Sequence, residues 1–385
     1  MYRKFKAGRI FTGSSFALNG SVLITDPSGM VEDIVPAEDA GEDVEIMEGI
    51  ISPGFINAHC HLELSHMKGV IPKHTGLVDF VFKIVTERNF DTAQIQLAIE
   101  KGADEMLRNG IVAVGDICNN ELTIAEKQRT RLYYHNFIEV GGFPPAVAVT
   151  RFQRALDLYR AYASALPANS LVPHAPYSVS PELFALLNDL PGNKIQSIHN
   201  QEIPDENELF ENRNGDFTRM YEKMNIDISF FEASGKSSLQ TYLPNLTKAQ
   251  QLILVHNVAT SAADLEFIAR HEKHTGMQVY FCLCPNANLY ISNKLPGIDL
   301  VNSFADRIVL GTDSLASNDQ LSILEEMKTL LKYFPTIEKQ TLFQWATLNG
   351  ARALQADRVF GSFEKGKKPG VVLVDEELAT AKRIL

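Results

Sequence analysis

The chain has few of the residues that mark secreted or membrane-spanning proteins. Among its 385 residues are only four cysteines, too few for a disulfide framework. Two of these, Cys282 and Cys284, lie in an apolar run and are expected to pack in a strand rather than bind a metal. No apolar run approaches the roughly 18 residues of a membrane span, and none of signal-peptide length follows Met1. These absences favour a cytoplasmic protein in a reducing environment.

Positive charge is also scarce. The chain carries 36 lysines and arginines against 47 aspartates and glutamates, for a formal net charge of -11. A surface of that sign repels the phosphates of nucleic acids and anionic membranes. The hydrophobic content of 45% is typical of a globular protein with one large or two modest domains. We therefore expect a small-molecule partner and neither nucleic acid nor membrane.

The middle of the chain alternates short apolar segments with amphipathic helices. Ser261 and Asp319 are expected to cap two of these helices at their N-termini. Eight strand–helix alternations over roughly 300 residues predict a (β/α)8 TIM barrel, which is an α/β fold, rather than a short doubly wound sheet. The predicted strands are 54–61, 111–116, 132–139, 170–174, 195–199, 252–256, 278–284 and 308–313.

The two ends of the chain follow a different pattern. Residues 1–50 alternate short apolar segments with turns, and near the C-terminus the apolar segment 371–374 follows a turn at Pro369-Gly370. Chain ends often lie close together in folded proteins. We therefore expect residues 1–50 plus 357–385 to form a composite β-sandwich domain beside a metal-dependent catalytic barrel of residues 51–356.

Polar residues follow the apolar strands at their carboxyl ends. His59 and His61 are two residues apart, so on a strand both rings point to one face, about 7 Å apart along it. Two neutral imidazole nitrogens in that arrangement suit chelation of one divalent ion. Barrel active sites form at the carboxyl ends of the strands. We expect the other strand-end residues at the same rim: Asp116, Glu139, His174, His199, His256 and Asp313.

Several segments around these residues resemble the amidohydrolase superfamily. Within it, the chain is similar to the nucleobase and nucleoside deaminases and to their chlorohydrolase-type relatives. The resemblance covers essentially the whole chain. The matching segments are Pro53 to His61, Pro173 to Ser178, His199 to Glu202, Val255 to Asn257, Cys284 to Asn288, Gly311 to Ser314 with Ala316 to Asn318, and Ala346 to Ala351.

This resemblance implies a metal centre made of His59, His61, His199 and Asp313. Three nitrogens and one oxygen suit Zn²⁺ or Fe²⁺ and leave a position for water; zinc is the expected ion, and iron stays open. Many dinuclear members of the superfamily need a carboxylated lysine at the end of the fourth strand. This chain has His174 there and no lysine, a departure that favours one metal ion.

The resemblance also implies catalytic roles for Glu202, His256 and Asp313. Glu202 would protonate a ring nitrogen of the substrate. His256 would orient the attacking water and stabilise developing charge. Asp313 would relay a proton to the leaving amine in addition to binding the metal. His174 is expected to contact the substrate.

Hydrolytic deamination of an amino-purine nucleoside or related heterocycle is the function that this resemblance implies. The segment from Leu62 to Ser65 resembles members that act on aminodeoxyfutalosine, an adenine nucleoside bearing a benzoate. Arg151 and Arg154 could pair with such a carboxylate or be exposed helix residues. The alternative is hydrolysis of an amide, a cyclic amide or a ring halide at the same site. A homodimer is expected by analogy only.

Overall fold

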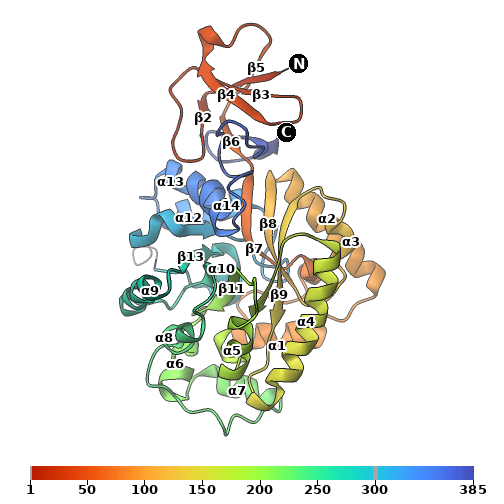
Figure 1. Cartoon of the computed structure of the whole chain (residues 1–385), viewed down its shortest axis with the longest axis vertical. Helices are drawn as coiled ribbons and strands as arrows, with labels where there is room; N and C mark the ends of the chain where they lie inside the picture. Colours follow the sequence, from red (N-terminus) through yellow and green to blue (C-terminus); the bar gives the residue numbers. More distant parts are fainter. Residues whose placement is uncertain (1, 298–301) are drawn as a thin grey trace.

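The computed structural model describes residues 2–297 and 302–385. Its central part is a barrel built from two four-stranded parallel sheets, with the strand orders β10-β9-β8-β7 and β11-β12-β13-β14 (Figure 1). These apolar strands are buried along almost their entire length, as strands covered on both faces must be. They are β7 (Phe55–Cys60), β8 (Ile111–Cys118), β9 (Tyr133–Val140), β10 (Asn169–Pro173), β11 (Ile195–Asn200), β12 (Gln251–His256), β13 (Gln278–Leu283) and β14 (Ile308–Leu310).

Backbone contacts at predicted site residues join the two sheets into a closed barrel. At one seam Cys60 forms a parallel bridge with Asp313, and the amide of Asp313 donates to the carbonyl of His59 over 3.1 Å. At the other seam the amide of His199 donates to the carbonyl of His174 over 3.0 Å. The predicted strands and the predicted barrel are confirmed.

The helices that connect the strands surround the barrel (Figure 1). No helix in the described parts of the chain is both long and apolar enough to cross a membrane. The helices are α1 (Leu77–Glu87), α2 (Thr92–Arg108), α3 (Ile124–Lys127), α4 (Ala148–Ala165), α5 (Pro181–Asn188), α6 (Pro204–Asn212), α7 (Asp216–Lys223), α8 (Ser238–Tyr242), α9 (Ala262–Thr275), α10 (Pro285–Ser292), α12 (Ile323–Tyr333), α13 (Lys339–Gln344) and α14 (Gly350–Ala353).

One of the two predicted helix caps is correct. Ser261 caps α9 in a capping box with Asp264, each side chain accepting from the backbone of the other. The prediction for Asp319 is wrong. Helix α12 begins later than expected, so its cap is Ser322, and Asp319 instead forms an exposed ion pair with Lys73.

Segments from both ends of the chain form two further mixed sheets, with the orders β4-β3-β1-β5 and β16-β15-β6-β2. Side chains from both sheets share one core, which includes Phe5, Leu23, Ile51 and Val371. The two termini lie at the same end of the molecule (Figure 1). The strands are β1 (Arg3–Lys6), β2 (Arg9–Ile10), β3 (Ser21–Thr25), β4 (Val31–Pro36), β5 (Val44–Ile46), β6 (Ile50–Pro53), β15 (Val371–Val374) and β16 (Ala381–Arg383).

The division of the chain into residues 1–50 plus 357–385 and residues 51–356 stays a prediction. Strand β6 runs across the first of these boundaries, because residues 50–53 pair with β15 in the terminal sheet. The next strand, β7, begins two residues after β6 ends and enters the barrel. The terminal sheets are thus directly continuous with the strand that carries His59.

Candidate active site

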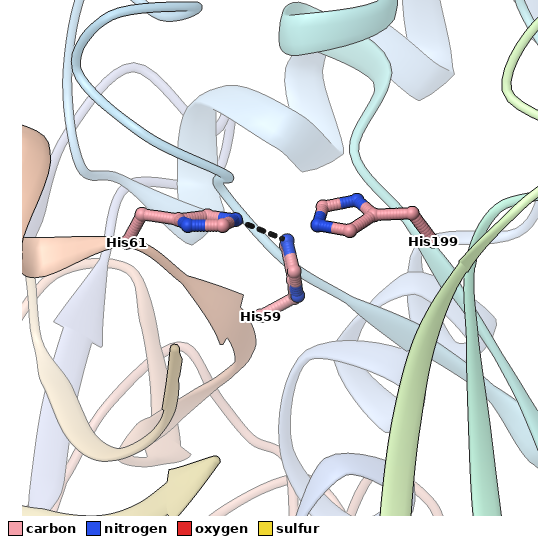
Figure 2. Close-up of side chains that lie close together, drawn as sticks. All are labelled: His59, His61 and His199. Atoms are coloured by element: carbon pink, nitrogen blue, oxygen red, sulfur yellow. Dashed lines mark hydrogen bonds between the residues drawn. The ribbon is translucent and has the colours of Figure 1, made fainter. Parts of the chain in front are cut away.

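The predicted metal ligands meet at the carboxyl ends of the barrel strands. The rings of His59, His61 and His199 point toward one another (Figure 2), and their ligand nitrogens all lie within 4.8 Å of one another. The Nε2 atoms of His59 and His61 are 3.2 Å apart. Oδ1 of Asp313 lies 3.4 Å from Nε2 of His59 and 3.3 Å from Nε2 of His61. The barrel therefore brings together four side chains that are far apart in sequence.

These separations fit a single divalent ion. With metal–nitrogen bonds of about 2.0–2.1 Å, tetrahedral geometry places neighbouring ligand atoms about 3.3–3.4 Å apart. Nε2 of His199 is buried and has no hydrogen-bond partner among the described residues. Burial lowers the pKa of His61 to about 3, so its imidazole is neutral near pH 7, as a ligand must be. Three imidazoles and a carboxylate suit zinc or ferrous iron.

Glu139 lies beside this cluster. In the sequence, only its position at the end of a predicted strand pointed to a place in the active site. Its Oε1 is 3.5 Å from Nε2 of His199 and has no hydrogen-bond partner among the described residues. Burial lowers the pKa of His199, but the Glu139 carboxylate outweighs burial and raises that pKa to about 9. A metal ion that binds this nitrogen would have to displace that proton.

The segment after β14 places Asp313 next to β7. Gly311 has no room for a side chain, because a Cβ there would lie 2.8 Å from Sγ of Cys282 and 2.9 Å from Cβ of His59. Asp313 itself has a left-handed backbone, with φ of 57°, a conformation that non-glycine residues seldom adopt. The Ser317 hydroxyl donates to Oδ2 of Asp313 over 2.5 Å, which leaves Oδ1 for the histidine cluster.

Glu202 and His256 adjoin the cluster on the side of β11 and β12. Oε2 of Glu202 lies 3.5 Å from Nε2 of His256, and that nitrogen is 3.1 Å from Nδ1 of His199. Burial raises the pKa of the Glu202 carboxyl to about 8, so this group carries a proton near pH 7. Burial also holds the pKa of His256 well below its usual value. The pair thus offers a neutral acid and a neutral imidazole beside the ligands.

The two predicted substrate-binding residues both line the cavity above this cluster. Its volume is about 920 Å³, within the usual range for small-molecule sites. His174 lies with its ring centroid 5.1 Å from that of His199, and its Nδ1 is 2.6 Å from the Ser178 hydroxyl. Arg151, on α4, lines the cavity, and Arg154 does not.

Asp116 does not join the active-site rim, so that part of the expectation is wrong. Its carboxylate is completely buried and forms an ion pair with Lys127 over 2.5 Å. It also accepts a hydrogen bond from the amide of Leu62 over 2.8 Å, the residue that follows His61. Its oxygens bind Lys127 and the amide of Leu62 inside the protein. Asp116 therefore holds the segment after His61 in place and does not line the cavity.

Replacement of Lys127 by methionine is expected to destabilise the fold by about 3–5 kcal/mol, because it leaves the Asp116 charge buried without a partner. Urea denaturation measures this change. Lys101→Met, at an exposed position on α2, is the matched control and should change the free energy of unfolding by less than about 0.5 kcal/mol. Equal stability of the two variants would contradict the importance of the buried pair.

The sequence matches the family model described as "Amidohydrolase family" over residues 50–383. Among curated proteins, a 5-methylthioadenosine/S-adenosylhomocysteine deaminase of Thermococcus kodakarensis is 27% identical over 351 residues, which cover 85% of this chain and 74% of that protein. The adenosine deaminase of Helicobacter pylori is 25% identical over 329 residues, with 83% and 77% covered.

Solved structures show the same fold. Helicobacter pylori aminofutalosine deaminase in complex with methylthio-coformycin superposes with a TM-score of 0.81 at 22% identity, covering 97% of this chain and 92% of that chain. A Xanthomonas campestris adenosine deaminase with bound zinc gives 0.73 at 20% identity, with 97% and 84% covered. The chain belongs to the amidohydrolase family, as a metal-dependent hydrolase of carbon–nitrogen bonds other than peptide bonds.

Proposed function

We propose that this enzyme hydrolyses the exocyclic amine of an amino-purine nucleoside or a related heterocycle and releases ammonia. The observation that carries the proposal is the position of Glu202 and His256 beside His59, His61 and His199 at one cavity. Similar proteins are deaminases of adenosine, of 5'-deoxyadenosine and of 5-methylthioadenosine and S-adenosylhomocysteine. All of these substrates contain adenosine or a derivative of it, which supports an adenosine-like substrate for this enzyme.

In this proposal each residue of the site has a separate role in the reaction. His59, His61, His199 and Asp313 would hold a divalent ion, which would lower the pKa of a water molecule to about 7 and so supply the nucleophile at neutral pH. Glu202 delivers its proton to the ring nitrogen next to the attacked carbon. His256 hydrogen-bonds the attacking oxygen and stabilises its charge. The first proton of water replaces the one that Glu202 gives to the ring nitrogen. Asp313 takes the second proton and passes it to the leaving amine, so water and amine become carbonyl and ammonia.

Within this class we propose aminodeoxyfutalosine as the specific substrate. The structural similarity to Helicobacter pylori aminofutalosine deaminase over 97% of the chain supports this choice. The cavity walls are largely apolar, as an aromatic substituent requires, and include Phe80, Val81, Phe143 and Met220. Arg151 supplies a cation in the same cavity, which suits the carboxylate of a benzoate.

A panel of substrates tests the proposed function. The zinc-loaded protein is incubated with aminodeoxyfutalosine, adenosine, 5-methylthioadenosine, a chlorinated triazine and a cyclic amide. We expect ammonia from the adenine nucleosides, together with the mass change of an amine replaced by a carbonyl. Release of chloride or of a ring-opened acid, with no ammonia from any nucleoside, would instead favour the halide or amide hydrolase alternative.

Arg151→Ala is expected to raise KM for aminodeoxyfutalosine about tenfold with little change in kcat, because a charge-assisted contact with the carboxylate is lost. Steady-state kinetics measure both constants. Adenosine has no carboxylate, so its KM should not change. Arg154→Ala, on the same helix but outside the cavity, is the control. An equal effect of Arg151→Ala on both substrates would exclude the assigned contact.

A further inference from the structure

Glu63 presents a carboxyl oxygen at the candidate substrate cavity. It lies on the short helix η2 (Leu62–Met67), two residues after His61, and its side chain is buried and lines the cavity. Oε2 of Glu63 accepts hydrogen bonds from the amide of Asn119 and from Nδ2 of Asn120, both over 2.9 Å. No donor among the described residues bonds Oε1. One oxygen is therefore used inside the protein and the other is free.

The two asparagines that hold Glu63 are themselves fixed. Nδ2 of Asn119 donates to Oε2 of Glu139 over 3.1 Å. Oδ1 of Asn120 accepts from the amide of Leu122 over 2.9 Å, and the carbonyl of Asn120 accepts from the Tyr162 hydroxyl over 2.8 Å. A ligand that bonds Oε1 thus meets a carboxylate whose orientation is already set, so little conformational freedom is lost on binding.

Within residues 2–297 and 302–385, no side chain or backbone group donates a hydrogen bond to this oxygen. Arg88 lines the same cavity, but its side chain forms no ion pair with any described residue, Glu63 included. Oε1 of Glu63 therefore faces the cavity without a protein donor, and a hydrogen-bond donor on a ligand is a suitable partner for it. In an adenine nucleoside the exocyclic amine belongs at the histidine cluster, and the ribose hydroxyls are the donors that remain.

We propose that Glu63 accepts a hydrogen bond from a ribose hydroxyl of the substrate, so that the enzyme selects ribonucleosides over deoxynucleosides and free nucleobases. This inference rests on the proposed deaminase function and names the substrate class more closely. Oε1 has two acceptor positions, enough for both hydroxyls of a vicinal diol. Glu63 acts here as a specificity residue, since it contacts the sugar and not the reacting carbon.

Glu63→Gln tests this role with minimal change in size. An amide can keep its oxygen toward the two asparagines, which places a donor where the free acceptor had been. We compare kcat/KM for adenosine, 2'-deoxyadenosine and 3'-deoxyadenosine. The wild type should use at least one deoxynucleoside about 10- to 100-fold less well than adenosine. In the variant, adenosine should lose about that factor and the deoxynucleoside little, so the preference disappears.

The controls separate sugar recognition from damage to the site. Glu121→Gln makes the same chemical change at an exposed position on the neighbouring loop and should keep the ribose preference. Zinc content should be the same in all proteins. If Glu63→Gln does not fold, Glu63→Asp, which withdraws the carboxylate, must show the same selective loss on adenosine. A preference that persists in the Glu63 variant, or that the wild type lacks, overturns the proposal.

A binding measurement keeps this test independent of turnover. Titration calorimetry with inosine, 2'-deoxyinosine and 3'-deoxyinosine reports the same sugar contact without any reaction. If the wild type releases no ammonia yet binds inosine more tightly than a deoxynucleoside in a Glu63-dependent manner, the deaminase function fails and the role of Glu63 stands. Ammonia release without a sugar preference in either assay would instead support the deaminase function and exclude the sugar contact of Glu63.

Discussion

Glu202→Gln is expected to lower kcat by about 10²- to 10⁴-fold while the protein keeps its metal ion, since this is the usual contribution of a general acid or base. Burial raises the pKa of Glu202 to about 8, so the native side chain is a neutral acid near pH 7. Glutamine has the same size and charge under these conditions but has no acidic proton to give. Ammonia release measures kcat, and metal analysis of the purified protein measures zinc.

Glu208→Gln is the matched control for this experiment. Glu208 lies six residues further along, on the exposed face of α6, and its replacement should leave both turnover and zinc content unchanged. Full activity of Glu202→Gln would remove this carboxyl from the proton path. Loss of zinc from the same variant would show that Glu202 acts on the metal centre, and the mechanism would need another acid.

Asp313→Ala is expected to abolish activity and to weaken zinc binding by more than about 100-fold. Loss of a residue that hydrogen-bonds to a metal ligand already costs about 10- to 100-fold in metal affinity, and in the proposed ligand set Asp313 is itself the oxygen ligand. Its Oδ1 lies 3.3 Å and 3.4 Å from the Nε2 atoms of His61 and His59. Competition with a zinc-binding dye measures the affinity.

The wild type treated with a chelator provides the reference state for this variant. Zinc should restore activity to the treated wild type and should not restore it to Asp313→Ala. Asp319→Ala removes a carboxylate from the same loop, where the side chain is 71% exposed, and should behave as the wild type. Tight zinc binding by Asp313→Ala would show that the histidines hold the ion without this carboxylate.

Local patterns in the sequence were sufficient for the barrel and for the positions of most candidate residues. Each predicted barrel strand coincides with an observed strand to within a few residues, because a continuous apolar run bounded by turns has few other solutions in an alternating chain. The same reasoning placed His59 and His61 on one face of a strand end. The cap at Ser261 also followed from local chemistry, since its partner Asp264 lies only three residues away.

Local patterns failed where the outcome depended on a distant partner. Asp116 and Glu139 both stand near strand ends, and nothing in the sequence separates them. The buried ammonium of Lys127 holds Asp116 inside the protein, whereas Glu139 turns toward His199. Asp319 was expected to cap a helix but pairs with Lys73, which is distant in sequence. In each case the orientation of the carboxylate depends on a side chain that a different element brings into contact with it.

The sequence alone determined the fold class, the family resemblance and the residue types available for metal binding, because strand periodicity and motif spacing are local properties of the chain. Only the tertiary structure decided which of those residues meet. Closure of the barrel between Cys60 and Asp313 sets the spacing of the candidate ligands, and packing of the loop after β8 leaves one oxygen of Glu63 free at the cavity. Both depend on contacts between segments far apart in sequence, which no local pattern encodes.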